Sequence, residues 1–332
     1  MAYFAKQANS RIVIHSTFFV EHPMTVSVHF AHISDIHLSK DGNERFMMSE
    51  EAAEGLRHIL ARLNAMPDLD FIFIGGDCLH HGHEEELARF RELVAGVEKP
   101  LLVIPGNHDG NLPEEPQVFT QRRFAAVFNP QFAARPATGQ AGYFSVAVGE
   151  GVQFIGLDTT LPGQVGGAVD AAQLDWLRGE LARHDDRLVI VGCHHPLHPL
   201  CPQDRQGKWR DWFVCANGES VQATLDAQPA VRLVLCGHHH VNRVFRRGRQ
   251  IHMAAPALVS YPCAYRLIRL WGEGDDLRIR WETLTLPEAV QAEAALRLQN
   301  SNFALEFDPQ NGKAFVEFAA GRPFDRAFEG GV

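Results

Sequence analysis

Short apolar runs alternate with polar loops and amphipathic stretches along most of the chain after Val26. Several runs have the length and the bounding residues of buried strands; they span 28–33, 71–74, 101–104, 152–157, 188–191 and 233–235. Between them, apolar residues recur at helical spacing near 50–64, 84–97, 116–127, 171–183 and 218–227. Strands that alternate with helices predict an α/β protein with helices on the faces of a sheet.

The pattern changes after Val241. Short apolar runs are now separated by glycine turns, and they lie at 244–247, 250–253, 265–270 and 277–283. Strands that follow one another so closely pair as hairpins. We therefore expect a second sheet that is rich in antiparallel strands.

The last segment, 300–332, contains six phenylalanines between proline and glycine breakers. It is too aromatic for a disordered tail, so we expect it to pack on the core or on the twofold mate of a homodimer. The chain then divides into an N-terminal leader at 1–25, one domain at 26–286, and a C-terminal helix with the Phe-rich segment at 287–332.

Composition narrows the class of protein. The 332 residues are 45% hydrophobic and 21% charged, which is ordinary for a globular protein with a full core. The formal net charge of -9 argues against general nucleic-acid binding, because surfaces that bind nucleic acid are basic. A small anionic substrate held by metal ions remains compatible, since a local site can oppose the net charge.

The six cysteines are scattered and include no CxxC pair. We therefore expect reduced thiols and a cytoplasmic location. No run approaches the roughly 18 apolar residues of a membrane span, and the N-terminal residues do not resemble a secretory signal. We expect no membrane span.

Polar residues gather where the predicted strands end. The segments that follow five of the strands read SDIH, GGD, PGNHD, GCHHP and CGHHH, in chain order. In an open α/β sheet, ligands bind in the crevice outside the carboxyl ends of the strands. These five loops therefore bring their histidines and carboxylates to one place.

The residue types in these loops indicate a metal site. Imidazole, carboxylate and amide ligands without a thiolate cage suit Zn, Fe, Mn or Co. The candidate ligands are Asp35, His37, Asp77, Asn107, His194, His238 and His240. Seven ligands are too many for one tetrahedral metal, but they suit two metals that share one carboxylate.

The motifs DxH, GGD, GNHD, HHP and GHxH, in this order, resemble those of the calcineurin-like metallophosphoesterase superfamily over about residues 28–285. The resemblance implies two mixed β-sheets packed as a sandwich between helices, with the active site at the C-terminal ends of the strands. It also implies that one metal is held by Asp35, His37 and His240, that the other is held by Asn107, His194 and His238, and that Asp77 bridges them.

The resemblance further implies that His108 is not a ligand but stabilises the transition state or protonates the leaving oxygen, with Asp109 orienting it. Residues 76–82 read GDCLHHG, whereas phosphoprotein phosphatases have GDxxDRG. His81 stands where those enzymes carry a substrate-binding arginine, and His80 stands where purple acid phosphatases carry a tyrosine ligand. The chain looks most similar to bacterial class III cyclic nucleotide and glycerophosphodiester phosphodiesterases.

Further residues are candidates for substrate binding. They are His80, His81, His195, Arg205 and Trp209. The loop 197–217 forms either a lid that grips a phosphate and stacks a base, or a hydrophobic plug under solvated cations. For His195, we favour the alternative that it lies beside the ligands and does not contact the substrate.

These observations predict a hydrolase with two divalent metal ions (Mn, Fe or Zn) that acts on a small-molecule phosphodiester, by in-line attack of a metal-bridging hydroxide. The substrate resembles a cyclic nucleotide or a glycerophosphodiester. Two alternatives stay open. The protein is a phosphomonoesterase of the same fold, or it is a catalytically silent regulatory protein that binds metal or nucleotide.

Overall fold

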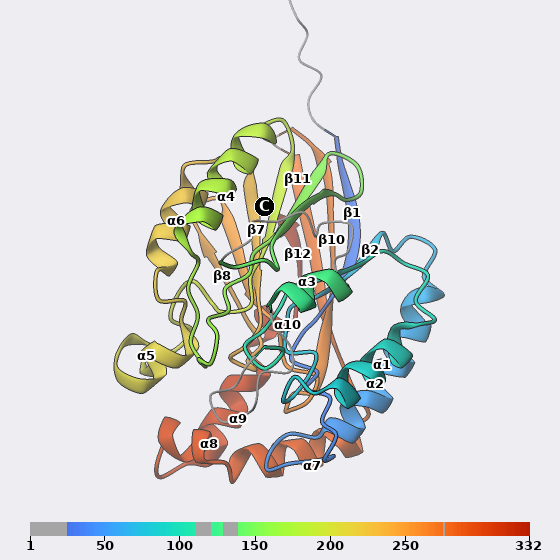
Figure 1. Cartoon of the computed structure of the whole chain (residues 1–332), viewed down its shortest axis with the longest axis vertical. Helices are drawn as coiled ribbons and strands as arrows, with labels where there is room; N and C mark the ends of the chain where they lie inside the picture. The colour runs from blue at the N-terminus through green and yellow to red at the C-terminus, as the bar shows by residue number, and fades with distance from the viewer. Residues whose placement is uncertain (1–24, 111–120, 129–138, 275) are drawn as a thin grey trace, which may run out of the picture.

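The computed structural model describes residues 25–110, 121–128, 139–274 and 276–332. These residues form two six-stranded sheets (Figure 1). The first sheet has the order β12 (Ala327–Gly331), β11 (Asp276–Thr285), β10 (Ala264–Glu273), β1 (Thr25–Ile33), β2 (Phe71–Ile74) and β3 (Leu101–Val103). The second has the order β4 (Phe144–Ala147), β5 (Val152–Gly156), β6 (Leu188–Gly192), β7 (Val231–Cys236), β9 (Gln250–Ala254) and β8 (Arg243–Arg247).

Both sheets are mixed. In the first, β1, β2 and β3 are parallel, and β10 runs antiparallel to β1. In the second, β5, β6, β7 and β9 are parallel, whereas the edge strands β4 and β8 run antiparallel to their neighbours. The hairpin pattern predicted that the strands after Val241 form a sheet of their own, and this prediction is wrong. One hairpin extends the second sheet and the other extends the first, because β9 and β10 each pair with an earlier strand.

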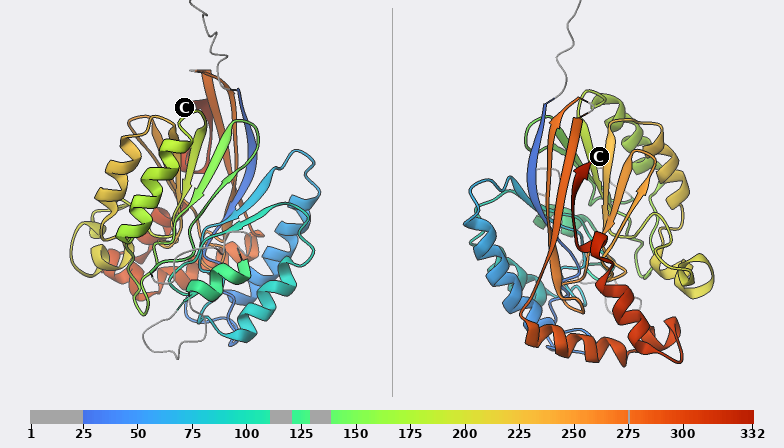
Figure 2. Two further views of the ribbon diagram at one scale, coloured as in Figure 1. Left: turned by 45° about the horizontal axis from the view of Figure 1, so that its top comes forward. Right: turned by 180° about the vertical axis from the view of Figure 1, so that it is seen from behind.

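The side-chain period of β1 shows how the layers form. Val26, Val28 and Phe30 point into the core between the two sheets, whereas Ala31 and Ile33 belong to the core on the opposite face. That second face is covered by α1 (Ser49–Asn64) and α2 (Glu84–Val94). The outer face of the other sheet is covered by α4 (Ala171–Arg183) and α6 (Gly218–Asp226). In both views of Figure 2, these two helices lie on the side of the sandwich opposite to α1 and α2.

Helices cluster at one end of the sandwich, at the bottom of Figure 1. They are α7 (Glu288–Gln299), α8 (Asn302–Phe307) and α9 (Gly312–Ala320), and they lie beside the 3-10 turn η2 (Gln203–Arg205) and α5 (Gly207–Phe213). The short α10 (Pro323–Arg326) then leads into β12, which pairs with β11. The phenylalanines of this segment contact the rest of the chain, around Trp209 and Trp281.

Helix α3 (Gln121–Phe128) overlaps the helix predicted near 116–127, whose first five residues are outside the described part of the chain. Of the predicted leader, residues 1–24 also lie outside the described part, and Thr25 begins β1. All six cysteines are buried and unpaired. Within the described ranges, no helix has the length and apolar character needed to cross a lipid bilayer.

Candidate metal centre

The side chains of the seven predicted ligands come together where strands of both sheets end. Asp35 and His37 follow β1, Asp77 follows β2, and Asn107 follows β3. From the second sheet, His194 follows β6, and His238 and His240 follow β7. Parallel strands deliver their carboxyl ends to one edge of a sheet, and here the edges of two packed sheets meet.

The backbone of these loops is tightly bent. Five of the seven residues have positive φ, which residues other than glycine rarely adopt; they are Asp35 (54°), His37 (46°), Asp77 (52°), His238 (68°) and His240 (59°). Such conformations cost of order 1–3 kcal/mol each and are concentrated at functional sites. The fold therefore holds these side chains in place at a cost in stability.

Asp77 lies at the middle of the group. Its Oδ2 is 3.4 Å from Nε2 of His37 and 3.2 Å from Nε2 of His194. On the His37 side, Nε2 of His240 lies 3.2 Å from Nε2 of His37 and 3.4 Å from Oδ1 of Asp35. On the His194 side, Nε2 of that ring is 3.2 Å from Oδ1 of Asn107.

The far nitrogens of two rings settle which ring atoms carry protons. Nδ1 of His194 lies 2.7 Å from the carbonyl oxygen of Gly75, and Nε2 of His238 lies 2.8 Å from that of Trp212. A carbonyl oxygen only accepts, so both of these nitrogens donate. In the neutral ring of His194, the lone pair of Nε2 therefore faces the Asp77 carboxylate, whose Oδ2 is 3.2 Å away.

Converging acceptors in a buried space need a cation. Asp35, Asp77 and His194 are each at most 1% exposed, so water cannot satisfy them. Two groups of donor atoms lie within 4.8 Å of one another and could each hold a metal ion: Asp35 with His37 and His240, and Asp77 with His194 and His238. The mixture of carboxylate, amide and imidazole donors fits divalent transition metals.

The electrostatics of the two sides agree with that fit. Burial lowers the pKa of His37 and of His238 well below the ordinary value, so both rings are neutral, as metal binding requires. For His194, burial acts in the same direction, but the adjacent Asp77 carboxylate outweighs it and raises the pKa of this histidine to about 9. The Asp77 side thus favours a bound positive charge strongly.

The chain matches a known family over the segment that carries these loops. The family described as calcineurin-like phosphoesterase matches residues 28–242, which include all seven converging residues. The chain belongs to the calcineurin-like phosphoesterase family. The predicted resemblance is thereby confirmed, and the protein is a member of a hydrolase family.

Two relatives of this phosphoesterase are named as phosphodiesterases. The glycerophosphodiester phosphodiesterase GpdQ of Enterobacter lignolyticus is 27% identical over 231 residues, which are 69% of this chain and 77% of that protein. A 3',5'-cyclic-nucleotide phosphodiesterase of Nostoc is 25% identical over 263 residues, which are 74% of this chain and 89% of that protein. A dimetal phosphatase from Danio rerio has the same fold, with a TM-score of 0.61 at 14% identity, over 79% of this chain and 96% of that chain. The predicted sandwich of two mixed sheets is confirmed.

His108 of this phosphoesterase borders the centre. Its backbone N–H donates to Oδ1 of Asp77 at 2.8 Å, and its ring lies 4.6 Å from that of His37. Its Nδ1 donates to the carbonyl oxygen of His80 at 2.7 Å. This bond fixes the ring and does not involve Nε2.

The family resemblance implied that Asp109 orients His108, but the hydrogen bonds of the Asp109 carboxylate go to other residues. Its carboxylate accepts from the backbone N–H groups of Leu79 and Gly106, at 2.8 and 2.9 Å. Asp109 thus joins the loop after β2 to the loop after β3. Burial and the neighbouring Asp77 charge raise the pKa of this carboxyl.

The candidates for substrate binding lie in different surroundings. Nδ1 of His80 is 3.3 Å from Nδ1 of His37, so His80 supports that ligand candidate, and burial lowers its pKa to about 3. Nδ1 of His81 faces Glu86 at 3.2 Å. His195 is fully buried between Thr159 and the Val165 carbonyl, at 2.8 and 2.9 Å.

The packing of the loop 197–217 has the features of the predicted hydrophobic plug. Arg205 is exposed at the end of η2, whereas Trp209 is 7% exposed and packs among phenylalanines of α5, α8 and α9. The indole N–H of Trp209 donates to Glu306 at 3.1 Å. This tryptophan is part of a hydrophobic plug, and the exposed lining of the loop comes from its neighbours Lys208 and Trp212.

Two contacts of the centre have no signal in the sequence. Oγ of Ser260 lies 2.9 Å from Nδ1 of His240, and the Trp212 carbonyl holds His238. Ser260 belongs to no motif, and a backbone carbonyl carries no residue type. Buried beside the centre, Asp204 also contacts His239 at 2.9 Å and accepts from the N–H groups of Leu200 and Cys201.

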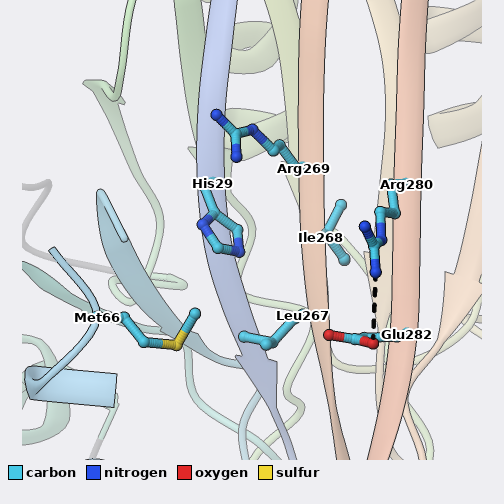
Figure 3. Close-up of a pocket in the computed structure, with 7 residues that line it drawn as sticks. All are labelled: His29, Met66, Leu267, Ile268, Arg269, Arg280 and Glu282. Carbon is cyan, nitrogen blue, oxygen red and sulfur yellow. Dashed lines mark ion pairs between the residues drawn. The ribbon is translucent and has the colours of Figure 1, made fainter. Parts of the chain in front are cut away.

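Two hollows differ in their relation to the centre. One of about 770 Å3 lies between Phe46, α5 and the helices α7 and α8. The other, of about 180 Å3, lies on the outer face of the first sheet, where Leu267 lies between Met66 and Glu282, with Arg269 and Arg280 farther along the strands (Figure 3). None of the seven ligand candidates lines this second hollow, so it is separate from the metal centre.

Proposed function

We propose that this protein is a phosphodiesterase that uses two divalent metal ions. The observation that carries the proposal is the convergence of five buried donor residues and the half-buried His240 on the two sides of the buried Asp77 carboxylate. Of the two alternatives, a silent regulatory protein has less support, because Asp77, Asn107 and His108 are all present and lie close together.

In this proposal, Asp35, His37 and His240 hold one ion, and Asn107, His194 and His238 hold the other. Asp77 contributes to both, because its Oδ2 lies within 3.4 Å of a ring from each set. Two bound divalent cations would neutralise phosphate oxygens and acidify a water molecule for in-line attack on phosphorus. The donor chemistry fits Mn, Fe and Zn equally and does not select one of them.

His108 is the proposed general acid. Its Nδ1 proton is committed to the His80 carbonyl, so in the protonated ring Nε2 carries the proton that can move. Donation of this proton to the leaving oxygen would be worth about 10²–10⁴ in rate. His80 and Asp77 position the residue, since one binds its ring and the other its backbone N–H.

The site suits diesters better than monoesters. A monoester dianion gains from an arginine whose fork matches two phosphate oxygens. The position of that arginine in phosphoprotein phosphatases is His81, which is paired with Glu86. A diester carries one negative charge and needs no such clamp. The names of the relatives, a glycerophosphodiester and a cyclic-nucleotide phosphodiesterase, support the same substrate class.

We also infer a cytoplasmic location, which the six unpaired thiols support.

The test compares two chromogenic esters with the same leaving group. Protein stripped of metal by a chelator is reloaded with Mn, Zn, Fe or Co, and kcat/KM is measured for bis-p-nitrophenyl phosphate and p-nitrophenyl phosphate. The proposal expects hydrolysis only in reloaded protein, with the diester preferred. A monoester preference of about tenfold or more, at equal metal loading, would overturn the diester assignment.

A further inference from the structure

Two large apolar side chains are strongly exposed in the part of the chain that the structure describes, and both lie on the C-terminal helices. Leu296 of α7 is 56% exposed, and Leu305 of α8 is 48% exposed. In Figure 1 these two helices form the lower end of the molecule. Single exposed leucines are common on protein surfaces, so the surroundings of these two decide whether they belong to an interface.

The two leucines lie beside each other in surroundings of opposite shape. Leu296 lines the cavity of about 770 Å3 between α5, α7 and α8, together with Asn302 and Glu306. Leu305 is not part of the lining, but it follows Asn302 by three residues and so lies on the same side of α8. An exposed projection, Leu305, therefore stands at the rim of a hollow.

A projection beside a hollow is the arrangement that a twofold contact requires. Such a contact uses the same surface patch of both copies, so each contact across the axis occurs twice, once in each direction. The Leu305 side chain of each copy can then enter the cavity of the other. Both exposed leucines of each copy become buried in this way, which is favourable.

The wall of the cavity also has the residue types of protein interfaces. Phe46, Trp212 and Phe303 provide aromatic rings, and Arg45 and Arg297 provide guanidinium groups. Aromatic residues and arginine are enriched at interfaces between proteins, and tryptophan and arginine often dominate their binding energy. The wall therefore suits contact with a protein surface.

The charges of the wall favour a second copy of this chain over a partner of one strong charge. The wall carries three cations and two carboxylates, whereas the whole chain has a net charge of -9. Lys208 lies 3.0 Å from Glu306, and Arg297 lies 2.7 Å from Glu293, so these charges are paired within the chain. Two acidic chains repel each other, and this repulsion is weakest where the meeting surfaces are not acidic.

We propose that this chain forms a twofold dimer in which Leu305 of each copy enters the cavity between α5, α7 and α8 of the other. The proposal is independent of the proposed function. Helices α7 and α8 lie beyond residue 242, where the family match ends, so the family does not imply this contact. Phe303 and Phe315 of the C-terminal segment pack on Trp209 of the same chain, so the twofold mate contacts the outer leucines instead.

Two substitutions separate the projection from the hollow. Leu305→Ala removes the projecting side chain and leaves the cavity open, whereas Leu296→Trp fills the cavity and leaves Leu305 in place. Neither leucine is part of the core, so both variants are expected to fold, which urea unfolding checks. Ala172→Trp is the control, because it adds the same bulk at an exposed position of α4, which covers the outer face of the second sheet.

The solution mass of the full chain is measured by light scattering and by sedimentation equilibrium. Wild type and Ala172→Trp should have twice the mass of one chain at about 10 µM protein. Leu305→Ala removes both leucine contacts of a dimer at once, so the dissociation constant should rise by about 100-fold or more. Leu296→Trp should be monomeric at the same concentration, because a tryptophan then occupies each cavity.

A mixture of the two variants tests the pairing directly. In a mixed dimer, Leu305 of the Leu296→Trp variant enters the open cavity of the Leu305→Ala variant, and the filled cavity faces an alanine. One of the two contacts is restored, so the variants should bind each other about tenfold or more tightly than either binds itself. Native mass spectrometry distinguishes mixed dimers by their mass. A monomeric wild type, undiminished dimers in either variant, or a mixture without mixed dimers would overturn the proposal.

Discussion

The metal centre and the cavity beside it are built by opposite means. The centre consists of fully buried charged groups on strained strand-end loops from both sheets. The cavity has half-exposed aromatic rings and paired surface charges on helices packed against one end. Charges buried in the centre act strongly on any phosphate bound there, whereas exposed ion pairs such as those around the cavity contribute little. Changes in the centre should therefore affect the hydrolysis of every diester.

The largest effect is expected for Asp77→Asn. The amide keeps the shape of the side chain, but it removes the negative charge that faces His37 and His194. Charge stabilisation by bound metals is worth several kcal/mol, so kcat/KM should fall by about 10³ or more for all diesters. Asp158→Asn is the matched control, because Asp158 is equally buried after β5 but accepts from Ala141, Gly142 and Thr160, which are not among the ligand candidates. A loss confined to one diester would contradict the assignment of Asp77 to a centre that acts on every diester.

Replacement of His108 separates catalysis from metal binding. In His108→Ala the backbone N–H that reaches Asp77 is retained, so metal content should not change. Loss of the general acid should lower kcat by about 10²–10⁴, and by less for p-nitrophenyl esters, whose leaving group needs no proton. Elemental analysis and kcat on esters of graded leaving-group pKa check this. A missing metal ion in the variant would make His108 a ligand.

Asp325 tests whether the C-terminal segment supports the fold without supporting the centre. This buried carboxylate accepts from the Val244 N–H and from Arg243, which fixes α10 to β8. Breaking a buried ion pair costs about 3–5 kcal/mol, so Asp325→Ala should lower the free energy of unfolding in urea by about 3 kcal/mol. Metal content of the folded variant should remain that of the wild type. A variant that loses metal but keeps the wild-type free energy of unfolding would show that the C-terminal segment supports the metal centre and not the fold.

The smallest expected effect concerns the pH dependence of stability away from the centre. Burial lowers the pKa of His252 to about 3, so this histidine is neutral in the folded protein and gains a proton on unfolding below its ordinary pKa. Stability is thus present above about pH 6.5 and is lost as the pH falls. From about pH 7.5 to about pH 5.5, the wild type should lose about 1.4 kcal/mol more than His252→Gln. Parallel urea midpoints in the two proteins would refute this contribution.

The contrast between centre and cavity also separates what the sequence could predict from what it could not. Asp35 and Asp77 follow the neighbouring parallel strands β1 and β2, so their convergence could be predicted from the strands alone. His194 follows β6 of the other sheet, so its approach depends on how the two sheets pack. The bond from Asp109 to Leu79 and the bond from His238 to the Trp212 carbonyl depend on how separate loops pack, and residue type does not encode that.

One of the C-terminal helices was hidden by its own boundaries. Gly312 and Gly321 look like breakers of an irregular segment, yet Gly312 begins α9 and Gly321 caps its end with a φ of 76°. In the same way, the short strands after Val241 gave no sign of their neighbours, because β9 and β10 pair with strands far away in the chain.

The number of metal ions bound per chain tests the central claim most directly. Protein loaded with Mn or Zn and freed of excess metal is measured by elemental analysis together with diester hydrolysis. Two ions per chain are expected in the wild type. His240→Ala should retain one, because that ring belongs to the Asp35 and His37 side only. Full diester hydrolysis by wild-type protein that holds no metal would contradict the account.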